Sequence, residues 1–162
     1  MVQQSPVPAT GRAPADVVRH AHAAFATGDI DAVMRLCADE ITFHIPGTSP
    51  LSGTWTGRER VLAFFATAAE LSEGTLALSP DEILADGERV VVLTRVHARR
   101  NGRAETFTNV HVVRVMEGRM TELREYMGDE RREDEFWRSP QTTEAPGTQR
   151  RAMTDPYDKQ PT

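Results

Sequence analysis

Apolar residues recur at helical spacing in three stretches of the first half of the chain. The first stretch, 15–27, is followed by Gly28, and the left-handed conformation at the end of a helix favours glycine there. A second, shorter helix is predicted over 29–37, with the side chain of Asp29 as its N-cap. A third helix is predicted over 58–71.

The segment between the second and third helices changes to an alternating pattern. Residues 40–47 alternate apolar and polar side chains, which predicts a half-buried strand. Because Pro46 ends this run, we expect the strand to lie at an edge of its sheet. Residues 51–57, in which two glycines flank Trp55, are predicted to form a loop.

The second half of the chain predicts four consecutive strands. Their expected bounds are 75–85, 88–100, 103–116 and 119–127. Two-residue turns ending in glycine separate them and suit the type I′ turns of β-hairpins. The four strands therefore form an antiparallel meander. Three N-terminal helices packed on a curved antiparallel sheet make an α+β fold.

A chain of 162 residues accommodates one domain with its own hydrophobic core. We place this domain at 15–137. Residues 1–14 and 138–162 are rich in proline and polar residues, and both are predicted to be disordered tails. Within the domain, 128–137 is charged and ends on two aromatic residues, which predicts a short helix or turn that lays an aromatic lid on the core.

Charge and composition restrict the partners of the chain. The net charge of -5 arises from 24 acidic and 19 basic residues that are mixed along the sequence, so no nucleic-acid partner is expected. No apolar run approaches the roughly 18 residues that span a bilayer, and the N-terminus lacks a secretion signal. We therefore predict a cytoplasmic protein without a membrane partner. The single cysteine, Cys37, has no disulfide partner within the chain and is expected to be buried.

Ionisable and amide groups occupy interior positions of the predicted strands, where a plain core would carry Val or Ile. These residues are Arg95, His97, Asn109, His111, Arg124 and Glu125. An unpaired ionisable group is costly to bury. The sheet therefore either forms the floor of a polar pocket or exposes one face to water.

Counting from the hairpin turns assigns these residues to faces of the sheet. With two-residue turns, the cross-strand partners are His97 with Thr106, Arg95 with Thr108, and Val110 with Glu125. The count then places Arg95, His97 and Glu125 on one face, together with Leu123. It places Asn109, His111, Arg124 and Tyr126 on the other face. One bulge within 103–116 would reverse the assignment of Asn109 and His111.

The set Arg95, His97 and Glu125 is our predicted catalytic group. An arginine lowers the pKa of a nearby carboxylate and orients it, and an imidazole exchanges protons near pH 7. Glu125 is then the general base or acid, His97 its proton partner and Arg95 the orienting charge. The alternative is an ordinary ion pair between Arg95 and Glu125 beside a histidine that serves only the sheet.

Three segments resemble the SnoaL-like, ketosteroid-isomerase-like branch of the NTF2-like superfamily. They are 43–47, 51–65 and 118–126, and the resemblance extends over 15–137. It implies a cone-shaped fold with a small, mostly apolar organic ligand in the cone and cofactor-independent acid-base chemistry. Cyclisation, isomerisation, water addition or elimination, and epoxide opening all fit. It also implies a homodimer through the outer sheet face, for which Val90, Val92, Thr94 and Val96 are suitably apolar.

Motif similarity to limonene-epoxide hydrolase concerns Arg95-Val96-His97, Arg124-Glu125-Tyr126, and the positions Thr42 and His44. The residues expected to contact the ligand are His44, Trp55, Asn109, His111, Leu123 and Tyr126. For Trp55, packing of its loop against the long helix is the alternative. The histidines lack the spacing of metal ligands, so no metal site is expected. A non-catalytic binding or scaffold module is the alternative function.

Overall fold

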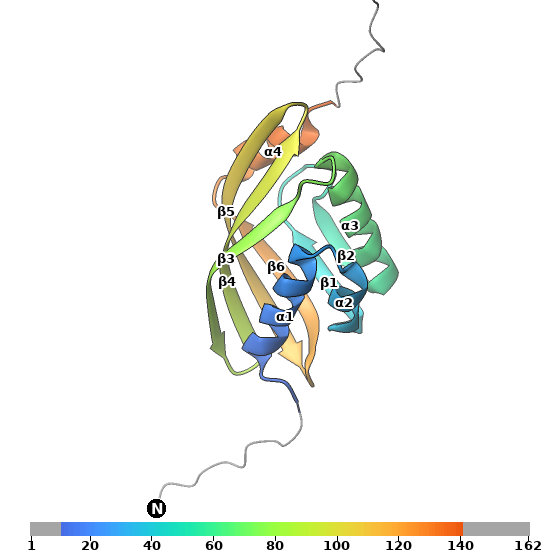
Figure 1. Cartoon of the computed structure of the whole chain (residues 1–162), viewed down its shortest axis with the longest axis vertical. Coiled ribbons are helices and arrows are strands. Elements are labelled where there is room, and N and C mark those ends of the chain that lie inside the picture. The colour runs from blue at the N-terminus through green and yellow to red at the C-terminus, as the bar shows by residue number, and fades with distance from the viewer. Residues whose placement is uncertain (1–10, 141–162) are drawn as a thin grey trace, which may run out of the picture.

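The computed structural model describes residues 11–140. Its helices are α1 (Pro14–Ala26), α2 (Ile30–Arg35), α3 (Arg58–Leu71) and α4 (Glu130–Arg138). Its strands are β1 (Cys37–Ile45), β2 (Gly53–Thr56), β3 (Ala77–Asp86), β4 (Arg89–Arg100), β5 (Arg103–Met116) and β6 (Arg119–Met127). The strands form one curved sheet in the order β2-β1-β6-β5-β4-β3, with α1, α2 and α3 on one side of it (Figure 1).

The three N-terminal helices form where the apolar periodicity predicts them. Gly28 follows α1 with a φ of 75°, and the Asp29 carboxylate caps α2 by accepting a hydrogen bond from the backbone N–H of Ala32 at 2.9 Å. The predicted end of the second helix is wrong. The helix stops at Arg35 because the backbone at Cys37 already pairs with Met120 of β6.

Strands β3 to β6 form the predicted antiparallel meander. Both residues of the turns at 101–102 and 117–118 have positive φ, between 51° and 76°, as a type I′ turn requires. The first turn of the meander is shifted by one residue from the prediction. Asp86 pairs with Arg89, so the turn consists of Gly87 and Glu88.

Two predictions for the segment around Pro46 are wrong. Strand β1 lies inside the sheet, because it pairs with β2 on one side and runs parallel to β6 on the other. The sheet is therefore mixed. The predicted loop contains the edge strand β2, whose backbone pairs with β1 from Thr56 to Gly53. The partner of β2 is β1, which lies about ten residues earlier in the chain, on the other side of Pro46. The residues of β2 show no local pattern that would indicate this pairing.

Alternate strand residues point into the core between the sheet and the helices. The buried strand residues of this core include Ile41, Phe43, Ile45, Val90, Val92, Val96, Val113 and Val115. The predicted outer placement of Val90, Val92, Thr94 and Val96 is thus wrong, since each is at most 4 % exposed. The outer face of β4 carries Val91 and Leu93 instead, both half-buried. A homodimer through that outer face stays a prediction.

Helix α4 closes one end of the fold, and its aromatic residues Phe136 and Trp137 are buried, as predicted. The Asp134 carboxylate fastens the helix to the loop after β1 by accepting hydrogen bonds from the backbone N–H groups of Thr48 at 2.8 Å and Ser49 at 3.1 Å. This approach requires glycine at position 47, where a Cβ atom would lie 2.3 Å from Asp134 Oδ1.

The predicted domain limits fall near the first and last described elements. Helix α1 begins at Pro14, and α4 ends at Arg138. The predicted tails at 1–14 and 138–162 lie mostly outside the described residues, so their disorder stays a prediction. Among residues 11–140, no helix has the combined length and apolar character that a membrane crossing needs.

Candidate active site

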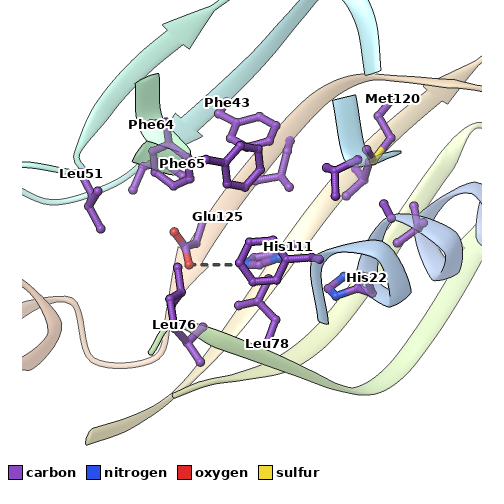
Figure 2. A pocket seen from close by; sticks show the side chains of 18 of the residues that line it. His22, Phe43, Leu51, Phe64, Phe65, Leu76, Leu78, His111, Met120 and Glu125 are labelled. Carbon is purple, nitrogen blue, oxygen red and sulfur yellow. Dashed lines mark hydrogen bonds and ion pairs between the residues drawn. The ribbon is translucent and has the colours of Figure 1, made fainter. Parts of the chain in front are cut away.

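A cavity of about 110 Å³ lies between the helices and the inner face of the sheet (Figure 2). Its wall is mostly apolar, with aromatic rings from Phe25, Phe43, Phe64, Phe65 and Trp137. The polar residues of the lining are His22, His111, Glu125 and Glu133. All four are ionisable, which is the composition expected of a site for proton transfer rather than of a plain core.

His111 and Glu125 lie opposite each other on β5 and β6. His111 Nε2 is 3.3 Å from Glu125 Oε1, and the two side chains are only 8 % and 11 % exposed. Burial acts to raise the pKa of Glu125, but the hydrogen bond and charge of His111 and a hydrogen bond from Asn109 outweigh it, so this pKa is below its usual range. Glu125 is therefore a carboxylate at neutral pH.

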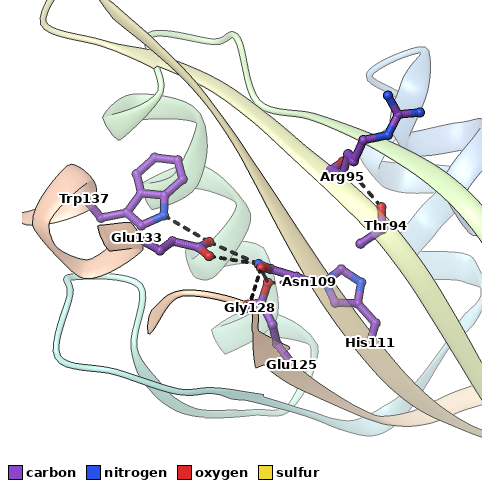
Figure 3. A network of polar contacts seen from close by, with 8 residues as sticks. All are labelled: Thr94, Arg95, Asn109, His111, Glu125, Gly128, Glu133 and Trp137. Carbon is purple, nitrogen blue, oxygen red and sulfur yellow. Dashed lines mark hydrogen bonds and ion pairs between the residues drawn. The ribbon is translucent and has the colours of Figure 1, made fainter. Parts of the chain in front are cut away.

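Asn109 connects Glu125 to a second carboxyl group, that of Glu133 on α4 (Figure 3). Its Nδ2 donates to Glu125 Oε1 at 2.8 Å and to Glu133 Oε2 at 3.0 Å. Burial and the nearby charge of Glu125 raise the pKa of Glu133 to about 7. One amide group thus separates two carboxyl groups whose pKa values move in opposite directions.

His22 reaches the cavity from α1, with its ring centroid 6.5 Å from that of His111 and the two rings nearly parallel at 16°. Burial, with the charge of His111 as a smaller cause, lowers the pKa of His22 to about 4. Its Nδ1 is buried without a hydrogen-bond partner among the described residues. His22 is therefore a neutral imidazole at pH 7.

A β-bulge decides which residues meet in the cavity. Val115 pairs with Met120, but Arg114 pairs with Glu122, so Thr121 is an extra residue in β6. The predicted pairing of Val110 with Glu125 is wrong by one residue as a result. The pairings within the β4–β5 hairpin are confirmed. The bulge lies in β6 and not in 103–116, and it turns Glu125 to the face of Asn109 and His111.

The predicted group of Arg95, His97 and Glu125 is therefore wrong, because its members lie on opposite faces. The Arg95 guanidinium forms an exposed ion pair with Asp81 at 2.7 Å and points away from the Asn109 network (Figure 3). The His97 ring is 2.9 Å from the hydroxyl of Thr106 on the same outer face.

The predicted ligand contacts divide between the two faces. Leu123 and His111 line the cavity, and Asn109 lies directly behind its carboxyl groups. The prediction that His44 and Tyr126 contact the ligand is wrong. His44 lies 3.5 Å from Glu122 on the outer face, and Tyr126 is 54 % exposed.

Trp55 matches the packing alternative rather than the ligand contact. Its indole packs edge-on against Phe64 with ring centroids 5.7 Å apart, and its Nε1 donates to the carbonyl oxygen of Leu51 at 3.0 Å. It is not among the cavity-lining residues. Trp55 therefore holds β2 and its loop against α3.

Two cavity residues escaped the sequence prediction, His22 and Glu133. The spacing of His22 from Val18 and Phe25 matches one helical face, which is the signal that identifies it. Glu133 lies in a charged segment, and only its position four residues before Trp137 suggests burial. Within residues 11–140, no group of three or more His, Cys, Asp or Glu side chains is arranged to hold a metal ion.

The family model that matches this chain is described as a SnoaL-like domain, and it matches residues 18–123. An uncharacterised protein of Mycobacterium tuberculosis is 30% identical over 129 residues, which cover 79% of this chain and 98% of that protein. An NTF2-like protein of unknown function from Burkholderia pseudomallei is similar in structure, with a TM-score of 0.69 and 30% identity over 78% of this chain and 98% of that one.

A more distant structural relative was crystallised with a small molecule. TerC, co-crystallised with polyporic acid, has a TM-score of 0.66 and 22% identity over 71% of this chain and 92% of its own. At this identity the likeness concerns the NTF2-like fold alone.

Proposed function

The chain belongs to the SnoaL-like domain family, and from this premise we propose that it is an enzyme that performs acid-base chemistry on a small, mostly apolar organic molecule bound in the cavity. The observation that carries the proposal is the set of carboxyl groups that Asn109 bridges. Environments that move two pKa values apart are typical of an acid and a base that act together. Cyclisation, isomerisation, water addition or elimination, and epoxide opening fit this chemistry.

Glu125 is the general base in this proposal. Its carboxylate is ionised, and the hydrogen bonds from His111 and Asn109 fix its orientation at the cavity wall. His111 takes the proton-sharing role that the sequence assigned to His97, because its ring is the one that contacts Glu125. No cofactor is needed for a transfer between these groups.

The size and lining of the cavity indicate the kind of substrate. A cavity of roughly 150 Å³ lined by apolar side chains binds benzene in another protein, so about 110 Å³ suits a molecule of about one ring. The apolar wall favours a molecule with few polar atoms. TerC, which shares the fold and was co-crystallised with polyporic acid, supports the expectation of a small-molecule ligand.

Exchange of the α-protons of cyclohexanone in D₂O, followed by NMR, and hydrolysis of cyclohexene oxide test the proposal. We expect the wild-type protein to accelerate at least one of these reactions over buffer, and Glu125→Gln to lose at least about 100-fold of the rate. His97→Ala is the matched control, because His97 contacts Thr106 on the outer face and does not line the cavity. Equal rates for Glu125→Gln and wild type would contradict the assignment.

A non-catalytic binding module is the second candidate. It is favoured by the mutual hydrogen bonds of Asn109, Glu125 and Glu133, which satisfy one another without a ligand. Saturable binding of cyclohexanone without acceleration of any reaction by the wild-type protein would support this candidate instead.

A further inference from the structure

Helix α4 covers one end of the cavity and is the last element of the described chain (Figure 1). It contributes Glu133 and Trp137 to the lining, and each of these residues is only 2 % exposed. Two residues, Gly128 and Asp129, connect the helix to β6. Movement of this one helix therefore exposes the end of the cavity while the strands stay paired.

The contacts that hold α4 to the rest of the fold are of two kinds. Away from the cavity, Asp134 accepts hydrogen bonds from the loop after β1, and Arg132 forms an ion pair with Glu105 of β5. At the cavity, Asn109 Nδ2 donates hydrogen bonds to both oxygen atoms of Glu133, at 3.2 and 3.0 Å. The charged groups of the first kind thus have partners elsewhere, and the carboxyl group at the cavity contacts a neutral amide.

Two buried carboxyl groups share that amide (Figure 3). Asn109 Nδ2 lies 2.8 Å from Glu125 Oε1 and 3.0 Å from Glu133 Oε2. An amide nitrogen carries two hydrogen atoms and no positive charge, so it can donate to both groups without neutralising either. If both groups ionise, the second negative charge is not offset by the residue that joins them.

The other ionisable groups of the lining do not offset this charge either. They are Glu125 on β6, His111 on β5 and His22 on α1, and within residues 11–140 the lining includes no lysine or arginine. The charge of His111 favours ionised Glu133, but burial and the charge of Glu125 outweigh it and raise the pKa of Glu133 to about 7. His111 itself contacts Glu125. Ionisation of Glu133 therefore disfavours the docked position of its side chain.

We propose that α4 is a lid on the cavity and that a proton on Glu133 keeps this lid docked. The inference rests on the proposed function in taking the cavity as the ligand site. When Glu133 ionises, movement of α4 separates the two carboxylates and returns the second one to water, which relieves both the repulsion and the cost of burial. The ligand site is then opened more often at neutral pH than in mild acid.

The direction of the pH effect follows from the two forms of the helix. In the open form Glu133 is solvated and has its ordinary pKa of 4.5, whereas in the docked form its pKa is about 7. The equilibrium constant for opening therefore rises with pH between these values, by about 40-fold from pH 5 to pH 7, and levels off above them. The burial of Phe136 and Trp137 favours the docked form at every pH.

Amide hydrogen exchange in 130–138 between pH 5 and pH 8 tests the proposal. After correction for the intrinsic exchange rate, we expect the protection of wild-type α4 to fall about 40-fold from pH 5 to pH 7, while the β4–β5 hairpin keeps its protection. Glu133→Gln has a similar shape but does not ionise, so this pH dependence should disappear. Glu135→Gln, an exposed change on the same helix, should retain it.

A second measurement follows the lid without a change at Glu133. The chain has two tryptophans, so Trp55→Phe leaves Trp137 as the tryptophan that reports on α4. We expect quenching of its fluorescence by acrylamide to increase from pH 5 to pH 7, because an open helix exposes a side chain that is 2 % exposed when docked. This measurement keeps the proposal testable if Glu133→Gln does not fold.

The outcomes separate the lid from the proposed function. Protection of wild-type α4 that is constant from pH 5 to pH 7 would overturn the lid, and so would the same pH dependence in Glu133→Gln. An equal loss of protection in the β4–β5 hairpin would also overturn it, because the proton would then stabilise the whole fold. Each of these results leaves acceleration of the probe reactions, and hence the proposed function, intact. A pH-dependent lid without any acceleration would overturn the proposed enzyme alone.

Discussion

The two faces of strands β4 to β6 carry similar residues in different environments. On the outer face, Arg95 pairs with Asp81 and His97 contacts Thr106, and all four side chains are reached by water. On the inner face, His111 and Glu125 make a comparable contact, but their side chains are 8 % and 11 % exposed. Burial, more than residue type, separates a surface pair from a candidate active site.

The difference between the two faces follows from their exposure to water, which sets the dielectric environment of each charge. Exposed charges are screened by water and salt, so an exposed ion pair contributes little to stability. In the cavity, loss of water and close neighbours displace the pKa values of His22, Glu125 and Glu133. Of these three groups, Glu133 is the one whose pKa of about 7 lies near neutral pH.

Insertion of one alanine between Leu123 and Arg124 exchanges the two faces of the rest of β6 and should have the largest effect. The added residue takes the position opposite Val112, so Arg124 turns toward the core and Glu125 turns outward. We expect loss of a cooperative thermal transition by circular dichroism, because an unpaired arginine is costly to bury. Thr121→Ala keeps the register and is the control. An insertion variant that melts as wild type does would show that the register does not set the faces.

Matched histidine substitutions compare the two faces directly. We expect His111→Gln to lower the rate of the accelerated reaction about 1,000-fold, since it removes the imidazole that contacts the general base. His97→Gln should leave the rate within about twofold of wild type. Initial rates with cyclohexanone or cyclohexene oxide measure both. Comparable losses in the two variants would remove the distinction between the faces.

Glu133→Gln should change how stability depends on pH. The folded-state pKa of about 7 is above the ordinary value of 4.5, so the folded protein holds this proton more tightly than the unfolded chain. Stability then falls as the pH rises from 4.5 to 7, by about 3 kcal/mol from this group. Urea unfolding at several pH values should show the free energy of unfolding of Glu133→Gln increasing by that amount, relative to wild type, as the pH rises over this range. A constant difference would argue that Glu133 is ionised in the folded state.

His22→Leu should act at the opposite end of the pH range. The folded-state pKa of about 4 is below the ordinary 6.5, so the folded protein holds this proton less tightly. The free energy of unfolding of wild type then decreases by about 2 kcal/mol as the pH falls from 6.5 to 4. This decrease is smaller than the full pKa shift would give, because the ring is partly exposed. In urea unfolding, the free energy of unfolding of His22→Leu should decrease less over the same pH range. His20→Leu, exposed on the same helix, is the control.

Asp81→Asn should have the smallest effect. It removes the exposed partner of Arg95, and both groups then remain solvated. We expect a melting temperature within the error of wild type and no change in reaction rate. A clear loss of activity would mean that the outer face takes part in function.

Much of the fold could be predicted from local sequence patterns. The helical periodicity of α1 and α3, the cap at Asp29 and the turn at 101–102 depend on residues that are close in the chain. The edge placement of β1 was wrong for the opposite reason. Its parallel contact with β6 joins residues about 80 positions apart, and a single strand pattern carries no record of such a partner.

The candidate site was predicted only in part. Glu125 was identified because a carboxylate is unusual inside a strand, and its bonded neighbours Asn109 and His111 were named as ligand contacts. Its supposed partners Arg95 and His97 were wrong because the count assumed regular pairing in β6. A threonine in a strand is ordinary, so nothing local marks Thr121 as the extra residue.

Apart from β2, the sequence by itself determined the types of the main elements, the meander and the alternation of side chains along each strand, because these follow from backbone preferences and from the period of two residues. The tertiary structure alone decided which residues meet around the cavity. The bulge in β6 set the face of Glu125, and the docking of α4 brought Glu133 beside it. Both depend on contacts between segments that are distant in the sequence. These contacts form, and contribute free energy, only when the chain folds.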